Sequence, residues 1–341
     1  MSSASTAPVR RILVTGVGGA PGFDLARRLM ELGCEVIGTD ADPLATGLRL
    51  PGLTAVVSPP VDDPTYHTAL LNLCRIHRPH ALMSTVEPEL PLILSMLPAL
   101  DDLLVRTWLP PQRAIRASLD KAAFYAVLTE HRIPTPRTWL PEHTDDIPYH
   151  CPLIVKPRRG QGSRGIVACD SRLHARVLVE LIPEPIVQTR IDGAREFTAD
   201  CLVDRHGRAS IILRYRQITK GGLSMVSETF HDREVHDVVA ATLAATGITG
   251  LCCVQGFLRD SQTTPVLMTE MNARAAGAFT VAEHAGADLI GQTLAGLWGL
   301  PVDHDRLHYR PGVRVTRYVG TLTAETAAVQ TISTGERYES A

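Results

Sequence analysis

At 341 residues the chain exceeds one ordinary domain, and its length predicts two or three modules. Apolar residues make up 45% of it, which is enough for a real core. A net charge of −2 and only 5% aromatic residues argue against a nucleic-acid-binding protein. No run approaches the roughly 20 apolar residues of a membrane span, and the seven cysteines show no zinc-like spacing. We therefore expect a cytoplasmic protein with reduced thiols and no membrane anchor.

The first hundred residues alternate short apolar runs with helical patterns. The runs that predict strands are 11–15, 35–39, 54–57, 81–84 and 103–106, and the helical patterns are 23–32, 66–77 and about 89–97. Strands that alternate with helices form parallel sheets, because each crossover between parallel strands needs a long connection. The pattern predicts a Rossmann-like α/β domain over residues 11–110, preceded by a flexible leader over 1–10.

A glycine-rich loop joins the first strand to the first helix. Gly16, Gly19 and Gly22 have the spacing of an extended dinucleotide-binding fingerprint, and Asp40 ends the second strand, where a ribose-binding acid would lie. The sequence has no tyrosine followed four positions later by lysine, the pair that a short-chain dehydrogenase needs for proton transfer. Three readings stay open: a dinucleotide site, a tight structural turn, or an anion site for the substrate. The sequence favours the last two.

The pattern changes after the proline-rich segment 108–112. Ser118 can cap a helix that runs to about His131. Strands joined by turns follow at 153–156, 165–169, 185–189, 195–204 and 210–217, with a helix at 171–181. Two further helices, 233–246 and 281–298, flank strands at 250–258 and 265–271, before a flexible tail over 319–341. This order predicts an α+β half with antiparallel sheet.

One segment of this half has the chemistry of a phosphate-binding site. Lys156 ends a strand, and a glycine-rich hairpin from Gly160 to Gly165 follows it. A glycine-rich backbone can fold over phosphates, with amide N–H groups and cationic side chains directed at the anion. About thirty residues later, a strand and a short connector lead to an acid, Glu196.

A second segment has the chemistry of a magnesium site. Glu270 and Asn272 are two positions apart on a predicted strand, so both side chains face the same side of the sheet. Gln255 lies on the preceding strand, and Arg274 follows two residues after Asn272. Carboxylate and amide oxygens suit Mg²⁺, which also binds substrate phosphates. Arg274 can then contact phosphate oxygens in a bidentate manner.

The order of these segments resembles the ATP-grasp superfamily, particularly a single half of the carbamoyl phosphate synthase large subunit. The resemblance runs from Arg11 to about Tyr318. It implies an ATP-grasp fold that combines α/β and α+β parts: a pre-ATP-grasp domain over 11–110 and two ATP-binding lobes over 111–187 and 188–318. It implies ATP and Mg²⁺ as cofactors, with Mn²⁺ as an alternative metal, and no second copy of the ATP unit.

The resemblance carries over residue by residue. It implies ATP binding by Lys121, Lys156, Gly160, Gly162, Ser163, Gly165, Gln188, Thr189, Arg190, Ile191 and Glu196. It implies metal binding by Gln255, Glu270 and Asn272, and catalytic roles for Arg274 and Lys156. Three positions depart from the usual pattern: Gln188 replaces a glutamate that reads adenine, Gln255 replaces one of two metal-binding acids, and Ala273 replaces a proline.

The function implied by this resemblance is an ATP-dependent carboxylate–amine ligase of the amino-acid or peptide ligase type. A small-molecule carboxylate would become an acyl phosphate, which an amine attacks, and ADP and phosphate would be released. Candidates for substrate binding are Arg214, Arg216, Lys220 and Glu87, although a solvated strand face and a helix cap explain them equally well. Two alternatives remain: an oxidoreductase that uses the glycine loop, and a non-catalytic ATP-binding module. Dimers are common among proteins of this resemblance, and the sequence leaves a homodimer open.

Overall fold

The structure is a computed structural model that describes residues 9–160, 162, 164–260, 263–323 and 330–331. The chain divides into two compact units. The second unit comprises Pro110–Thr293 and Pro301–Tyr318, and the first comprises the rest of the chain. The predicted leader lies almost wholly outside the described residues, as does most of the predicted tail.

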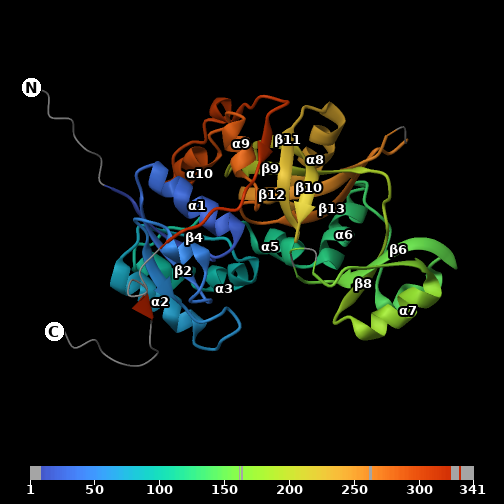
Figure 1. Ribbon diagram of the computed structural model, residues 1–341, viewed down its shortest axis with the longest axis horizontal. Coiled ribbons are helices and arrows are strands. Elements are labelled where there is room, and N and C mark those ends of the chain that lie inside the picture. Colours follow the sequence, from blue (N-terminus) through green and yellow to red (C-terminus); the bar gives the residue numbers. More distant parts are fainter. Residues whose placement is uncertain (1–8, 161, 163, 261–262, 324–329, 332–341) are drawn as a thin grey trace, which may run out of the picture. The chain divides into compact units, whose positions relative to one another are not determined.

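The first unit contains a parallel sheet with the strand order β15-β3-β2-β1-β4 (Figure 1). Its strands are β1 (Arg11–Thr15), β2 (Glu35–Asp40), β3 (Thr54–Val57), β4 (Ala81–Ser84) and β15 (Gln330–Thr331). Its helices are α1 (Ala20–Glu31), α2 (Tyr66–His77), α3 (Leu90–Ser95) and α4 (Leu97–Asp102), with short 3₁₀ turns at Thr46–Arg49 and Glu87–Glu89. The parallel α/β prediction is therefore confirmed. The predicted strand over 103–106 does not form, because Arg106 makes only an isolated bridge to Ala81.

The core of this unit follows from its strand sequences. Ile12, Leu13 and Val14 are at most 1% exposed, since a parallel strand buries side chains on both of its faces. The predicted flexible tail differs from the structure at Gln330–Thr331, which pair in parallel with β3 at the edge of the sheet. Backbone pairing with an unoccupied sheet edge needs no side-chain pattern, so the sequence contains little signal for it.

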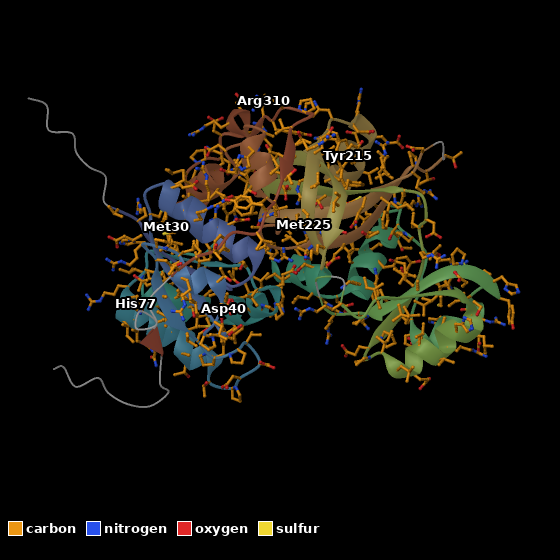
Figure 2. All side chains as sticks on the ribbon, in the orientation of Figure 1. Met30, Asp40, His77, Tyr215, Met225 and Arg310 are labelled. Carbon is orange, nitrogen blue, oxygen red and sulfur yellow. The ribbon has the colours of Figure 1, made fainter. Side chains whose placement is uncertain are left out.

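The N-terminal glycine loop is a tightly packed turn. A Cβ added at Gly22 would lie 2.1 Å from the carbonyl oxygen of Gly16, so only glycine fits there. The carboxylate of Asp40 (Figure 2) accepts a hydrogen bond from the backbone N–H of Gly18 at 2.7 Å. Asp40 thus stabilises the loop itself, which favours the structural turn over a ribose-binding acid.

The second unit begins with two helices, α5 (Gln112–Leu119) and α6 (Lys121–Glu130). The predicted cap at Ser118 is wrong, because the Ser118 hydroxyl donates to the Ile115 carbonyl inside α5. Asp120 caps α6 instead, with its carboxylate accepting from the backbone N–H groups of Ala122 and Ala123. Asp120 is a strong N-cap residue, so the predicted helix begins at Lys121, and α5 before it is a helix that the sequence analysis did not predict.

A four-stranded antiparallel sheet follows, in the order β5-β8-β6-β7. Its strands are β5 (Thr138–Trp139), β6 (His150–Pro157), β7 (Val167–Ser171) and β8 (Pro185–Thr189), and α7 (Arg172–Leu181) contacts β6, β7 and β8 (Figure 1). Ser171 caps α7 by accepting from the His174 N–H. A core of Trp139, Ile147, Leu153, Val155, Cys169, Ala175 and Val187 fills the space between sheet and helix.

A six-stranded antiparallel sheet completes the unit, in the order β13-β12-β9-β10-β11-β14. Its strands are β9 (Arg195–Val203), β10 (Ala209–Lys220), β11 (Leu223–Thr229), β12 (Gly250–Leu258), β13 (Val266–Asn272) and β14 (Arg314–Thr316), and α8 (Arg233–Thr246) contacts β10 and β13. The predicted helix over 281–298 is two helices, α9 (Thr280–His284) and α10 (Leu289–Leu297). Gly286 between them has φ of +109°, which is incompatible with a continuous helix.

Candidate nucleotide and metal site

A chain of hydrogen bonds holds Lys156 at the end of β6. Its Nζ donates to Gln188 Oε1 at 2.9 Å, and Gln188 Nε2 donates to Thr138 Oγ1 at 2.8 Å. A lysine ammonium can only donate, so the amide oxygen of Gln188 must face it. Gln188 therefore orients Lys156, and Thr138, a residue that the sequence did not single out, orients Gln188.

Lys156 is 7% exposed, and burial lowers its pKa to about 8. The charge of Glu270 counteracts this shift, and the charge of Lys121 adds to it. Glu270 belongs to the six-stranded sheet and Lys156 to the four-stranded sheet. The fold thus brings two predicted site residues, 114 positions apart in the sequence, within electrostatic reach of each other.

Hydrogen bonds and an ion pair join the start of the glycine-rich hairpin after Lys156 to the start of α6. Lys121 Nζ donates to the Gly160 carbonyl at 2.8 Å. Arg158 makes a bidentate ion pair with Asp120, at 2.6 and 2.7 Å. The sequence did not predict this ion pair, because neither partner belongs to a recognised motif. Gly162 and Gly165 lie within the hairpin, whereas Ser163 lies outside the described residues.

The turn between β10 and β11 reaches the same hairpin. A Cβ added at Gly222 would lie 2.9 Å from the Cα of Gly162, so the two backbones are in direct contact. Lys220, at the end of β10, is exposed next to this turn. Loops from the two sheets of this unit therefore meet at the predicted phosphate-binding segment.

The predicted hinge over 188–191 is only partly available to a nucleotide base. The backbone N–H of Thr189 donates to the Arg137 carbonyl, and that of Arg190 donates to the Pro152 carbonyl, both at 2.9 Å. The Arg190 side chain forms ion pairs with Asp170 and Asp192. These two N–H groups therefore already have partners, and adenine binding by the segment stays a prediction. Ile191, which follows directly, is half-buried.

Polar side chains line one face of the six-stranded sheet. Gln255 on β12 lies opposite Glu270 on one side and Thr198 on the other, and Thr198 lies opposite Arg214. Asn272 is two positions from Glu270 and Glu196 two from Thr198, so both face the same side. Tyr215 (Figure 2) alternates to the opposite face, where it stacks on Phe230.

Arg216 connects two of these side chains. Its Nη1 donates to Glu196 Oε1 at 2.8 Å and to Gln255 Oε1 at 3.0 Å. Burial raises the pKa of Glu196, the Arg216 guanidinium opposes that rise, and the charge of Glu270 adds to it. Glu196 and Glu270 are half-buried carboxylates that repel each other, and such a pair favours the binding of a cation.

Arg214 is the predicted site residue that the structure contradicts. Its side chain is 2% exposed and pairs with Asp200, which is 1% exposed, at 2.7 and 3.3 Å. Asp200 on the neighbouring strand neutralises the guanidinium inside the protein. Arg214 is therefore a structural residue and is not placed to bind a substrate.

The predicted metal ligands fit a hard divalent cation. Gln255, Glu270 and Asn272 present one carboxylate and two amide oxygens on one face of the sheet, and Arg274 Nη2 donates to Asn272 Oδ1 at 3.0 Å. Amide oxygens are neutral ligands of the kind that a hard divalent cation binds. Among the described residues no cluster of three or more Asp, Glu, His or Cys could hold a metal.

The acids of the first unit lie at the carboxyl end of β4. Glu89 is 4% exposed and accepts hydrogen bonds from Thr15 at 2.5 Å and from Ser84 at 2.8 Å. Burial raises the pKa of Glu89, and these hydrogen bonds oppose the rise. Glu89 thus joins the ends of two strands inside this unit. Glu87 is also buried, at 5% exposure, and its predicted contact with substrate stays a prediction.

Comparison with known proteins agrees with this arrangement. Residues 182–321 match the sequence model of a family described as ATP-grasp in the biosynthetic pathway with Ter operon. Through these residues the chain is similar to the ATP-grasp superfamily. Its fold, with an N-terminal α/β domain ahead of the two ATP-grasp sheets, is the one that the sequence predicts. No curated protein sequence matches the chain.

Three solved structures have a similar fold. Biotin carboxylase from Campylobacter jejuni, in a β,γ-ATP complex, is 15% identical with a TM-score of 0.71, over 90% of this chain and 74% of that one. L-amino acid ligase from Bacillus licheniformis is 18% identical with a TM-score of 0.66, over 90% and 78%. The biotin carboxylase domain of 2-oxoglutarate carboxylase from Hydrogenobacter thermophilus, in complex with MgADP, ADP and bicarbonate, is 15% identical with a TM-score of 0.68, over 89% and 73%. No helix in the described part of this ATP-grasp chain is long and apolar enough to cross a bilayer.

Proposed function

We propose that this ATP-grasp protein is an ATP-dependent carboxylate–amine ligase of the amino-acid or peptide ligase type. A substrate carboxylate attacks the γ-phosphate of ATP, which forms an acyl phosphate and releases ADP. An amine then attacks the acyl carbon and displaces phosphate. Among its structural relatives, one is an L-amino acid ligase and two others are complexes with ATP or ADP, which supports nucleotide use by this fold.

The single observation that carries this proposal is that the turn between β10 and β11 meets the glycine-rich hairpin, where a Cβ added at Gly222 would lie 2.9 Å from the Cα of Gly162. Lys156 lies beside this hairpin, where burial lowers its pKa and the charge of Glu270, on the polar face of the other sheet, counteracts that shift. A phosphate chain with its counter-ion needs both kinds of group within a few ångströms. In a structural ion pair, Lys156 would donate a hydrogen bond directly to Glu270, but it donates to Gln188 instead.

The residues have separate tasks. Lys156 and Arg274 offset negative charge on the transferred phosphate, and Glu196 receives the ribose hydroxyls. Gln255, Glu270 and Asn272 would hold Mg²⁺, or Mn²⁺ in its place, and the metal would neutralise phosphate charge. No protein nucleophile is needed, because positioning and charge stabilisation account for phosphoryl transfer. The Gly18–Asp40 hydrogen bond counts against the oxidoreductase alternative.

The experiment is ADP and phosphate release from MgATP with pools of amino acids and of small carboxylates. We expect release that depends on a pool, and a loss of about a thousandfold in Glu270→Ala, because one metal ligand and its charge are removed. Asp260→Ala is a matched control, since Asp260 is an exposed acid paired with Arg195. AMP in place of ADP, or pool-dependent release that persists in Glu270→Ala, would contradict the proposal. ATP binding without turnover by any pool would favour the non-catalytic module.

A further inference from the structure

We propose that Arg216 occupies the metal side of the nucleotide-free site as a resident counter-cation, which the divalent cation must displace from Gln255. The inference rests on the proposed function, because it takes Gln255 and Glu270 as metal ligands. Arg216 Nη1 contacts the oxygens of two residues with predicted ligand roles, Gln255 for the metal and Glu196 for the ribose. The same guanidinium therefore satisfies both groups.

The burial of Arg216 supports a built position rather than a surface contact. Its side chain is 8% exposed, and its Nη2 donates to the Gly222 carbonyl at 2.7 Å. Its Nε is buried without a hydrogen-bond partner among the described residues. A buried donor without a partner costs free energy, so this position of the arginine is not the one that satisfies all of its five donors.

Electrostatics makes the arginine and the metal compete. A guanidinium nitrogen lies 3.0 Å from Gln255 Oε1, the oxygen that the cation would bind. Two positive charges on one oxygen repel each other strongly when water is largely excluded. Without a nucleotide the cation therefore binds weakly. The phosphates of a nucleotide bring negative charge, which gives Arg216 new acceptors and allows the metal to take its place.

A consequence is that metal and nucleotide bind cooperatively. If displacing Arg216 is a cost that the phosphates offset, the nucleotide tightens metal binding, and the metal must tighten nucleotide binding by the same factor. Removing the arginine then weakens this coupling, and what remains comes from the phosphate oxygens that bind the metal directly. It leaves a site that binds the cation better on its own, because Glu196 loses its counter-charge and Gln255 Oε1 loses its hydrogen-bond donor.

The test measures Mn²⁺ binding by electron paramagnetic resonance, first without nucleotide and then with saturating ADP. In Arg216→Met we expect Mn²⁺ to bind at least about tenfold tighter without nucleotide, and the tightening by ADP to be at least about threefold smaller than in the wild type. In the wild type we expect ADP to tighten Mn²⁺ binding by at least about tenfold. Arg195→Met is the matched control, with the same change of charge next to Glu196 but on the opposite face, where Arg195 contacts Tyr215 and Asp260.

The control should bind Mn²⁺ within about twofold of the wild type, since its charge faces away from the ligands. Arg216→Gln repeats the measurement if Arg216→Met does not fold. Unchanged or weaker nucleotide-free Mn²⁺ binding in a folded Arg216 variant would overturn the inference. If Mn²⁺ binding is unchanged or weaker in the variant while the wild type releases ADP with a substrate pool, only the inference about Arg216 is overturned. If Mn²⁺ binding is tighter in the variant while the wild type releases no ADP with any pool, only the proposed ligase reaction is overturned.

Discussion

Replacing Lys156 with methionine is expected to lower kcat/KM for ATP by about a thousandfold, because the only buried lysine of the described site loses its charge. The melting temperature should stay within about 3 °C of the wild type, since methionine fills the same space and removes a desolvated ammonium. ADP release gives kcat/KM, and calorimetry gives the Kd of ATP. Normal ATP affinity and turnover in a folded Lys156→Met variant would show that this lysine does not contact the nucleotide.

The pKa of Lys156 adds a pH dependence to this prediction. Burial lowers that pKa to about 8, so the ammonium that attracts phosphate is lost as the pH rises through 8. The Kd of ATP should increase by up to about tenfold per pH unit above 8, whereas in Lys156→Met it should be weak and independent of pH. The effect of Lys156 on the free energy of unfolding has the opposite pH dependence to its effect on ATP affinity. The unfolded chain binds more protons than the native one between pH 8 and 10, so this lysine's contribution to stability rises with pH.

The second large effect is on stability. Asp200→Ala is expected to cost about 3–5 kcal/mol, because it leaves the guanidinium of Arg214 buried at 2% exposure without its counter-charge. For a unit of this size, such a loss lowers the melting temperature by about 10 °C. Thermal unfolding followed by circular dichroism measures it. The double variant Arg214→Met/Asp200→Leu should recover most of the loss, since no unpaired charge remains in the sheet.

A surface pair on the same sheet provides the comparison. Arg314 on β14 pairs with Glu228 on β11, and the arginine side chain is 63% exposed. Glu228→Ala should lower the melting temperature by no more than about 3 °C, because exposed ion pairs contribute less than about 1 kcal/mol. Equal losses in Asp200→Ala and Glu228→Ala would contradict the assignment of Arg214 to the folded core rather than to the substrate.

The sequence predicts the parts of this fold that depend on local patterns. Alternating strands and helices indicate the parallel sheet of the first unit, and the residues 250–258 are correctly predicted as a strand to the residue. Lys156 and Glu270 are recognisable because each belongs to a short motif at a strand end. The strands β11 and β14 escaped prediction. β11 is rich in serine and has weak alternation, and β14 has only three residues at the edge of its sheet.

Pairings across the sheets are not readable from one sequence. Arg214 and Arg216 alternate on β10 and look equivalent, but the register sets Asp200 beside one and Glu196 beside the other. That neighbour decides whether an arginine belongs to the core or to the site. Gln188 is a similar case, because only the three-dimensional structure shows that its oxygen faces Lys156 rather than lying free for a base.

The most direct test of the central claim uses the pool that stimulates ADP release, with its carboxyl groups labelled with ¹⁸O. If the carboxylate attacks the γ-phosphate, one labelled oxygen remains between carbon and phosphorus in the acyl phosphate. Attack by the amine then leaves that oxygen on phosphorus. Mass spectrometry of the released phosphate should find one ¹⁸O per turnover. Phosphate without label would mean that the oxygen comes from water, and an acyl phosphate route for this protein would be contradicted.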